Sequence, residues 1–302
     1  MQDELIGIIT TELAEQLKNG AGILLIIVSV SYVSSVFTAT TGESDSGMKD
    51  IISFAVICLL CVPMMENVKN VITNATETIE EIKVVMLSSI PALCATQIGD
   101  AVAGAAIFIT LTQTAAVLLS GIFLPLALAY TVVGICGSVS DRFSLDGVKG
   151  MVKYVFNWGL GLMMMGFSCA ATLSGALTGA KTSMAARTLK YTGAMVPVVG
   201  RYLAESTDMV FAGASVIKST AGIAAVTAIL TAAAAPCVKM ATHVLIYRIA
   251  GIMIRPVAAP KISNAVTNVG DAFMMITGIT ALMSVLSVLN VAVLVTLVRG
   301  GV

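Results

Sequence analysis

Lysine, histidine and tyrosine side chains recur at every fourth position in the largely apolar segment that follows Pro236. Lys239, His243 and Tyr247 therefore share one face of the helix that this segment predicts, and His243 is the single histidine of the chain. A polar stripe on a membrane helix must face protein or water, because hydrocarbon does not solvate it. The stripe is compatible with the wall of an aqueous path and with a structural hydrogen-bond network. It predicts no metal site, because one histidine falls short of a metal's ligand set.

Lys218 is a second candidate for a functional polar residue, because it lies in the apolar stretch 209–235. A cation within a span is costly and indicates a function by default, unless its side chain snorkels to the membrane surface. Both interpretations of Lys218 stay open. Asp208 lies ten residues earlier, about three helical turns, which is too far for a direct pair within one helix. A pair between Lys218 and Asp100 is the alternative.

The sequence carries no strong catalytic signature. It has no His-Glu-x-x-His motif, and no glycine-rich loop is followed by the Gly-Lys-Ser/Thr that cradles nucleotide phosphates. The Gly-x-Ser at 166–168 is common by chance, so its combination with His243 is weak evidence for a serine dyad. Cys58 and Cys61 form a Cys-x-x-Cys pattern, but all six cysteines lie in apolar stretches, which favours packing over a disulfide or a metal. We therefore predict no enzyme, no cofactor and no metal.

The composition indicates which kind of scaffold carries these residues. Of 302 residues, 57% are hydrophobic and 11% are charged, whereas a soluble domain has about 25% charged residues. The chain cannot cover a water-soluble surface, and with a net charge of zero and no basic face it is not expected to bind nucleic acid. Its apolar stretches are continuous, which argues against an alternating β-barrel pattern. We predict an all-α fold, a polytopic membrane helix bundle in the lipid bilayer.

Charge-free windows predict about seven full spans and two short segments that contain proline. The seven full spans are expected within 19–42, 101–140 (two helices that turn near Gly121–Pro125), 154–180, 209–255 (a pair separated by Pro236) and 272–298, and 51–65 is expected to form a shorter span that ends at Pro63. The short segments are 84–99, with Pro91, and 191–208, with Pro197. The first 18 residues predict an interfacial helix, 66–83 a surface helix and 256–271 a polar link. The start lacks a secretory-signal pattern, so the chain either needs none or is cut from a longer one.

Corresponding residues suggest an internal repeat. The matched pairs are Pro91 and Pro197, Asp100 and Asp208, and Pro125 and Pro236. An odd number of spans in each copy would invert the second copy, an architecture typical of transporters with a site at the repeat interface. The alternative is that apolar sequence aligns easily with itself. The expected division is 1–83 (an amphipathic helix, two spans and a surface helix), 84–180 (repeat 1) and 191–298 (repeat 2).

Several short motifs in the second half of the chain carry a more specific signal. They are Arg187–Tyr191, Val196–Gly200, Asp208, Val216–Lys218, Pro236, Lys239, Ile246-Tyr247 and Pro256. In these motifs the chain resembles the stage III sporulation protein AE family, and the similarity covers roughly residues 5–298. The chain departs from the family at Ser219, where asparagine is usual, and at its start, where members usually have a secretory signal.

The resemblance implies a non-enzymatic, multi-pass subunit in the mother-cell membrane that surrounds the forespore. It implies three kinds of partner: other membrane subunits of a trans-envelope sporulation channel, an associated ATPase subunit, and a protein in the forespore membrane. Such a channel supports forespore activity and activation of the late sigma factor. The repeat and Lys218 favour an alternative, a stand-alone secondary transporter with an inverted-repeat fold.

Overall fold

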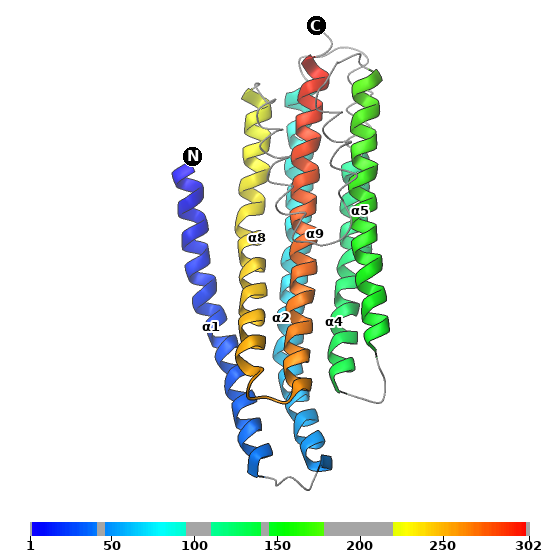
Figure 1. Ribbon diagram of the computed structural model, residues 1–302. Helices are drawn as coiled ribbons and strands as arrows, with labels where there is room; N and C mark the ends of the chain where they lie inside the picture. The colour runs from blue at the N-terminus through cyan, green and yellow to red at the C-terminus, as the bar shows by residue number, and fades with distance from the viewer. Residues whose placement is uncertain (1, 41–45, 95–109, 140–144, 178–219, 300–302) are drawn as a thin grey trace. The chain divides into compact units, whose positions relative to one another are not determined.

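The computed structural model describes residues 2–40, 46–94, 110–139, 145–177 and 220–299, and within these ranges it contains helices and no strand (Figure 1). The elements are α1 (Gln2–Thr40), α2 (Ser46–Cys94), the π-helical turn η1 (Leu119–Phe123), α4 (Leu124–Val139), α5 (Asp146–Leu177), α8 (Thr220–Ile254) and α9 (Pro260–Arg299). Residues 110–118 are also helical and lead into η1. The prediction of an all-α fold is confirmed.

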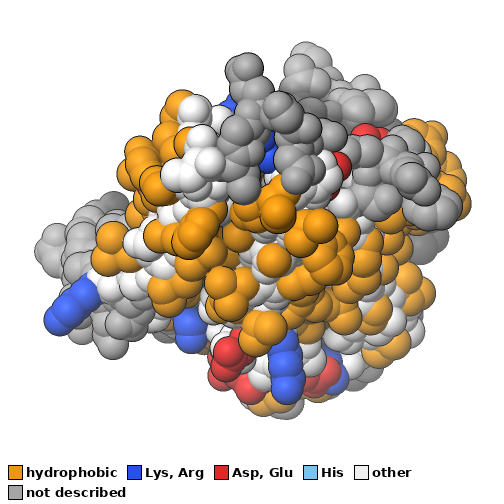
Figure 2. All heavy atoms as spheres, turned by 90° about the horizontal axis from the view of Figure 1, so that it is seen from below, with side chains coloured by type: hydrophobic (Ala, Val, Ile, Leu, Met, Phe, Trp, Pro, Cys, Tyr) orange, Lys and Arg blue, Asp and Glu red, His pale blue; other side chains and the backbone are white. Residues whose placement is uncertain are grey.

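Five helical segments in the described ranges are long and apolar enough to cross a membrane. They are Gly20–Thr40, Gly47–Ser89, Thr110–Val139, Ala224–Ile254 and Pro260–Val293. Large hydrophobic side chains stand exposed along these helices, among them Phe37 on α1 and Val62 on α2, and Figure 2 shows many hydrophobic side chains among the described residues on the face that it displays. Exposed apolar surface of this extent fits contact with lipid better than contact with water. The five helices fit a membrane protein, but the expected count of about seven spans is not confirmed.

The predicted turn near Gly121–Pro125 is wrong, because the chain runs helically from residue 110 to residue 139. The π-helical turn η1 stands where the break was expected. Pro125 has no N–H to donate to the carbonyl of Gly121, and its ring crowds that carbonyl. A wider turn just before the proline accommodates the ring and keeps the chain helical.

Pro236 also lies inside one helix, α8, and not between two helices as predicted. Proline removes a single N–H donor, and in an apolar helix neighbouring groups and small local adjustments satisfy the freed carbonyl. The predicted polar link over 256–271 is likewise too long, because α9 begins at Pro260. Proline suits the first position of a helix, where its missing N–H would have no helical partner.

The predicted short elements at the N-terminal side merge into longer helices. Helix α1 joins the expected interfacial helix to the first span. Helix α2 joins the expected span 51–65, the surface helix 66–83 and the start of the segment 84–99. Helix α5 covers most of the expected span 154–180 but is not among the five segments that meet the requirements for crossing a membrane.

The chain divides by its internal contacts into two compact units. Unit 1 contains Met1–Asn74, Leu124–Lys153 and Ala235–Thr277, and unit 2 contains Ala75–Phe123, Tyr154–Ala234 and Gly278–Val302. Residues 95–109 of the first proposed copy and 191–219 of the second lie outside the described residues. The inverted repeat and the division at 83, 180 and 191 therefore stay predictions.

Within unit 1, α8 and α9 form a tight antiparallel hairpin (Figure 1). The Ala258 N–H donates to the Ile254 carbonyl at 2.7 Å and closes the end of α8. The Ser263 hydroxyl donates to the Gly251 carbonyl at 3.2 Å, and a Cβ at Gly251 would stand 2.9 Å from Thr267 Oγ1. The missing side chain of Gly251 thus permits the close approach that holds α8 in place.

Unit 2 contains an aromatic contact and a buried amide contact between its helices. Phe123 meets Phe156 edge-on, with ring centroids 5.7 Å apart. A Cβ at Gly159 would stand 2.6 Å from the Phe123 ring, so the glycine makes room for that ring. Deeper in the unit, the buried amide of Asn290 donates to the Thr112 hydroxyl, which ties α9 to the helical residues before η1.

Candidate functional site: a polar pocket between α1, α2 and α8

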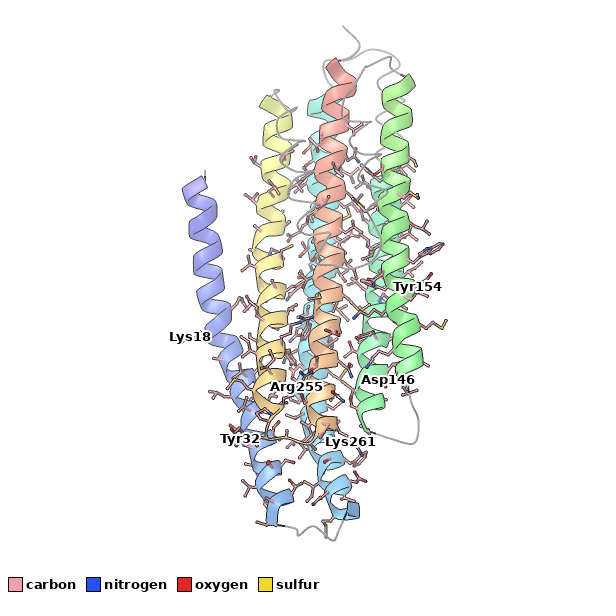
Figure 3. All side chains as sticks on the ribbon, in the orientation of Figure 1. Lys18, Tyr32, Asp146, Tyr154, Arg255 and Lys261 are labelled. Carbon is pink, nitrogen blue, oxygen red and sulfur yellow. The ribbon has the colours of Figure 1, made fainter. Side chains whose placement is uncertain are left out.

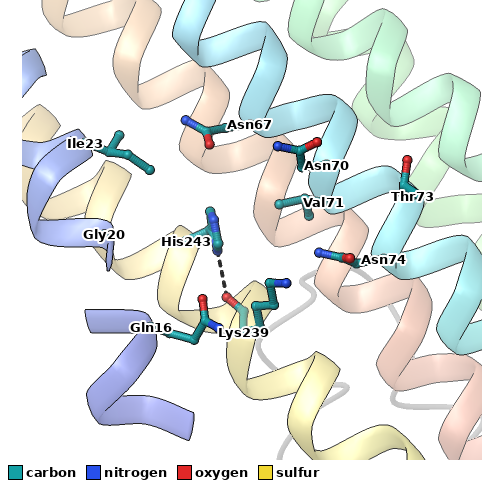
Figure 4. Close-up of a pocket in the computed structure, with 10 residues that line it drawn as sticks. All are labelled: Gln16, Gly20, Ile23, Asn67, Asn70, Val71, Thr73, Asn74, Lys239 and His243. Carbon is teal, nitrogen blue, oxygen red and sulfur yellow. Dashed lines mark hydrogen bonds between the residues drawn. The ribbon is translucent and has the colours of Figure 1, made fainter. Parts of the chain in front are cut away.

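A polar pocket in unit 1 is the strongest candidate for a functional site (Figure 4). It has a volume of about 410 Å³ and is lined by Gln16, Gly20, Ile23, Asn67, Asn70, Val71, Thr73, Asn74, Lys239 and His243. Seven of these ten residues carry polar side chains. Polar groups are costly in an apolar setting unless water, protein or a ligand solvates them. The lining therefore suits water or a polar ligand.

Helix α2 supplies the amide side of the pocket. Asn67, Asn70 and Asn74 are spaced three and four residues apart, which places them on one face of the helix. They follow directly after the apolar run 51–65, at the point where α2 becomes polar. Asn70 and Thr73 are exposed, so the pocket is open along this edge.

Helix α1 closes another side of the pocket, and Gly20 sets how near it comes. A Cβ at Gly20 would overlap Cδ1 of Ile246 on α8. A larger residue would have to displace that side-chain end or move α1 away from α8. The glycine thus brings Gln16 and Ile23 into the lining.

Helix α8 supplies the charged side of the pocket. Lys239 is the one permanently charged residue of the lining, and no carboxylate is among the ten described residues that form it. His243 Nδ1 lies 2.8 Å from the Lys239 carbonyl oxygen. Because a carbonyl only accepts hydrogen bonds, Nδ1 is the donor, and Nε2 of the neutral ring is left as an acceptor.

Tyr247 continues the same face of α8 one turn beyond His243. Its hydroxyl oxygen accepts a hydrogen bond from Asn67 Nδ2 at 3.1 Å, so the buried end of the stripe is tied to the amide side of the pocket. Behind the stripe, Phe273 of α9 packs edge-on against both rings, at 5.8 Å from His243 and 4.9 Å from Tyr247. The aromatic backing holds the two rings toward α2.

The structure brings together three of the residues that the sequence singled out. Lys239 and His243 line the pocket, and Tyr247 bonds to a residue of its lining. The other four, Asp100, Pro197, Asp208 and Lys218, lie outside the described residues. Sequence reasoning missed the amides of α2, although the Asn-x-x-Asn-x-x-x-Asn spacing within 66–83 is a visible one-face signal.

A second polar cluster in unit 1 surrounds Asp271 of α9. Its carboxylate accepts hydrogen bonds from Arg248 of α8 at 3.2 Å and from the Tyr130 hydroxyl of α4 at 3.4 Å. Lys153 of α5 lies 3.9 Å from the same carboxylate. One turn earlier, the buried Asn268 donates to the Gly134 carbonyl of α4 at 2.9 Å. Through this cluster, α9 contacts α4, α5 and α8 within unit 1.

Comparison with known proteins decides the family. The sequence profile described as stage III sporulation protein AE matches residues 2–298. The chain belongs to this family. It is 23% identical over 252 residues to the stage III sporulation protein AE of Bacillus subtilis (strain 168), which covers 81% of this chain and 63% of that protein. The chain thus spans less than two thirds of that relative's length. No solved structure matches the chain.

For this stage III sporulation protein AE family member, the Asn67–Tyr247 bond supports a small and specific prediction. Tyr247→Phe removes the accepting hydroxyl and is expected to lower the free energy of unfolding by about 0.5–1.5 kcal/mol. Denaturant unfolding in mild detergent measures the change. Tyr32→Phe is the matched control, because Tyr32 is exposed on α1 (Figure 3). Equal stabilities of the two variants would contradict the prediction.

Proposed function

We propose that the chain is an integral membrane subunit of a multi-protein trans-envelope sporulation channel. It would lie in the mother-cell membrane around the forespore and would work with other membrane subunits, a separate ATPase and a protein of the forespore membrane. In this proposal the chain is not an enzyme, and the channel supports forespore activity and late sigma factor activation. The match of the family profile over residues 2–298 carries the proposal.

The apolar helices support the membrane part of the proposal. Five described segments have the length and composition of membrane spans. Outward-facing side chains such as Leu25 and Phe37 on α1 and Ile51 and Val62 on α2 suit lipid. A multi-pass subunit follows if at least two of these segments cross the bilayer.

A stand-alone secondary transporter is the second candidate function. The observation that favours it is the pocket with Lys239 and His243, which places charge and amides between otherwise apolar helices. A transporter needs such a polar site and needs no partner proteins. The two candidates therefore differ in what they predict for the purified protein.

Copurification from sporulating cells distinguishes the two. The chain, carrying an affinity tag, is extracted from membranes in mild detergent and its companions are identified by mass spectrometry. A channel subunit is expected to retain other membrane proteins and an ATPase in a fixed ratio. The same tag on an unrelated multi-pass protein is the control. A chain that elutes alone and moves solute when reconstituted in liposomes would refute the channel proposal in favour of the transporter.

A further inference from the structure

The described lining of the pocket in unit 1 carries a positive charge, that of Lys239, and no negative charge. Lys239 is intermediate in exposure and lies within the apolar segment Ala224–Ile254. Within the described residues, its ammonium group makes no ion pair and no hydrogen bond. A lysine in this setting is costly unless something neutralises or solvates it. Among the described residues, the pocket lining offers it amides but no carboxylate.

The hydrogen-bonding groups of the lining favour an anion over a cation. The amide groups of Asn67, Asn70 and Asn74 can each donate, and the Lys239 ammonium has three donor hydrogens. A cation would meet the Lys239 charge, and the ten described lining residues include no carboxylate to offset it. An oxyanion instead meets a positive charge and several donors that converge from two helices, which is the arrangement that carboxylates and phosphates favour.

The size of the pocket sets the scale of the ligand. A volume of about 410 Å³ is within the range of small-molecule sites, roughly 300–1,000 Å³. The exposed edge at Asn70 and Thr73 gives access. Exposed apolar side chains follow on α1 at Leu25 and Ile26, so a ligand with a charged head and an apolar tail could place the tail along that helix.

We propose that this pocket binds an oxyanionic group, a phosphate or a carboxylate, through the Lys239 ammonium and the side-chain amides of α2. The group belongs either to a free solute or to the headgroup of an anionic lipid. Both sources present the same chemistry to the pocket. Gln16 and Ile23 of α1 also line the site, so the bound group lies between α1, α2 and α8.

Binding of inorganic phosphate to the full chain in neutral detergent tests the free-solute source. The unmodified protein is expected to show saturable binding by calorimetry, and chloride at matched ionic strength is not expected to compete. Lys239→Met is expected to weaken phosphate binding at least tenfold, and Asn70→Ala about threefold. Lys18→Met is the matched control, because Lys18 is exposed on α1 outside the lining (Figure 3). It should bind phosphate within twofold of the unmodified chain.

Lipid retention tests the second source. The delipidated chain is placed in nanodiscs of phosphatidylcholine with or without phosphatidylglycerol, and bound lipid is counted by native mass spectrometry. Preferential retention of phosphatidylglycerol that Lys239→Met abolishes and Lys18→Met leaves intact supports a headgroup site. Helical content, checked for every variant by circular dichroism, must match that of the unmodified chain. The proposal is overturned if neither probe binds selectively, or if Lys239→Met and Asn70→Ala bind both probes as the unmodified chain does.

Discussion

Gly134→Val is expected to lower the free energy of unfolding by about 3 kcal/mol, from an overpacking cost of about 1–3 kcal/mol and the loss of a buried hydrogen bond. Gly134 lies on α4 directly against α9. A Cβ at this position would stand 2.8 Å from Asn268 Cβ and 3.1 Å from its Cγ. These are atoms near the backbone of α9, which cannot swing aside as the end of a flexible side chain can. Valine adds two further methyl groups in the same space, so α4 and α9 must separate.

The separation also breaks polar contacts. The Asn268 amide donates to the Gly134 carbonyl at 2.9 Å and to the Ser138 hydroxyl at 3.3 Å, and its oxygen accepts from Lys149 at 3.3 Å. Asn268 and Ser138 are buried, so a donor that loses its acceptor there is left without water. Steric and polar costs therefore act in the same direction.

Gly150→Val is the matched control for Gly134→Val. Gly150 lies on α5 in the same unit, and a Cβ there meets nothing within 4 Å. Its replacement is expected to leave stability unchanged or to raise it slightly, because valine has a higher helix propensity than glycine. Denaturant unfolding in detergent measures both variants. A loss in Gly134→Val no larger than that in Gly150→Val would show that α4 and α9 are not packed at this glycine.

The polar face of α8 was predictable because it depends on one helix alone. Four-residue spacing puts Lys239, His243 and Tyr247 in line wherever the helix lies. The α2 side of the pocket depends on which helix packs against α8, and that pairing is a long-range contact that a single sequence does not reveal. The predicted surface helix 66–83 contained the three asparagines, but nothing in their spacing points to α8.

The predicted helix breaks failed for a shared physical reason. The sequence predicts helix breaks at Pro125 and Pro236, yet each proline removes only one N–H donor from a long apolar helix. In hydrocarbon, backbone N–H and C=O groups without hydrogen bonds are costly, so the rest of the backbone stays helical. The π-helical turn η1 precedes Pro125 and accommodates it, and Pro236 lies within α8 without ending the helix. Proline alone is thus a weak boundary signal in an apolar chain.

The second cluster of unit 1 was missed for a related reason. Asp271 falls in the segment 256–271, whose two prolines and charges predicted a polar link. The structure instead starts α9 at Pro260, so Asp271 sits three turns into a helix. A carboxylate at that depth needs partners, and these come from α4, α5 and α8, which the sequence alone does not bring together.

Asp271→Leu is expected to lower the free energy of unfolding by about 2–3 kcal/mol. The substitution removes the one carboxylate that Arg248 and Lys153 share, at 3.2 Å and 3.9 Å. Asp271 and Arg248 lie within the segments Pro260–Val293 and Ala224–Ile254, and an uncompensated charge costs about 2.5–3.5 kcal/mol at the centre of a span on insertion scales. The estimate is below two such penalties because Arg248 and Lys153 are about half exposed and can partly reach solvent.

Asp50→Leu is the control that tests whether the burial of the carboxylate or the length of its ion pair determines the loss of stability. Asp50 pairs with Lys261 at 2.9 Å, a shorter contact than either charge pair of Asp271, but its side chain is 68% exposed against 26% for Asp271. Asp50 itself is exposed, and Lys261, although its side chain is 21% exposed, lies in the first turn of α9, where its long side chain can reach water once the pair is broken. A pair whose charges water can reach contributes about 0–1 kcal/mol. We therefore expect the shorter pair to matter less. Equal losses in the two variants would mean that solvent reaches Asp271 as freely as Asp50.

Asp271→Asn then shows how much of the stability that Asp271 contributes comes from its negative charge and how much from its hydrogen bonds. Asparagine keeps an oxygen that accepts from Arg248 and Tyr130 but cannot neutralise the two cations. If the negative charge is the main contribution, Asp271→Asn should lose most of what Asp271→Leu loses, and Arg248→Met in the Asp271→Asn background should restore part of it. A double-mutant cycle gives the coupling energy between the two positions directly. A coupling energy near zero would assign the stabilisation to the Tyr130 hydroxyl and to packing, and it would remove the role of Asp271 as the counter-charge between α5 and α8.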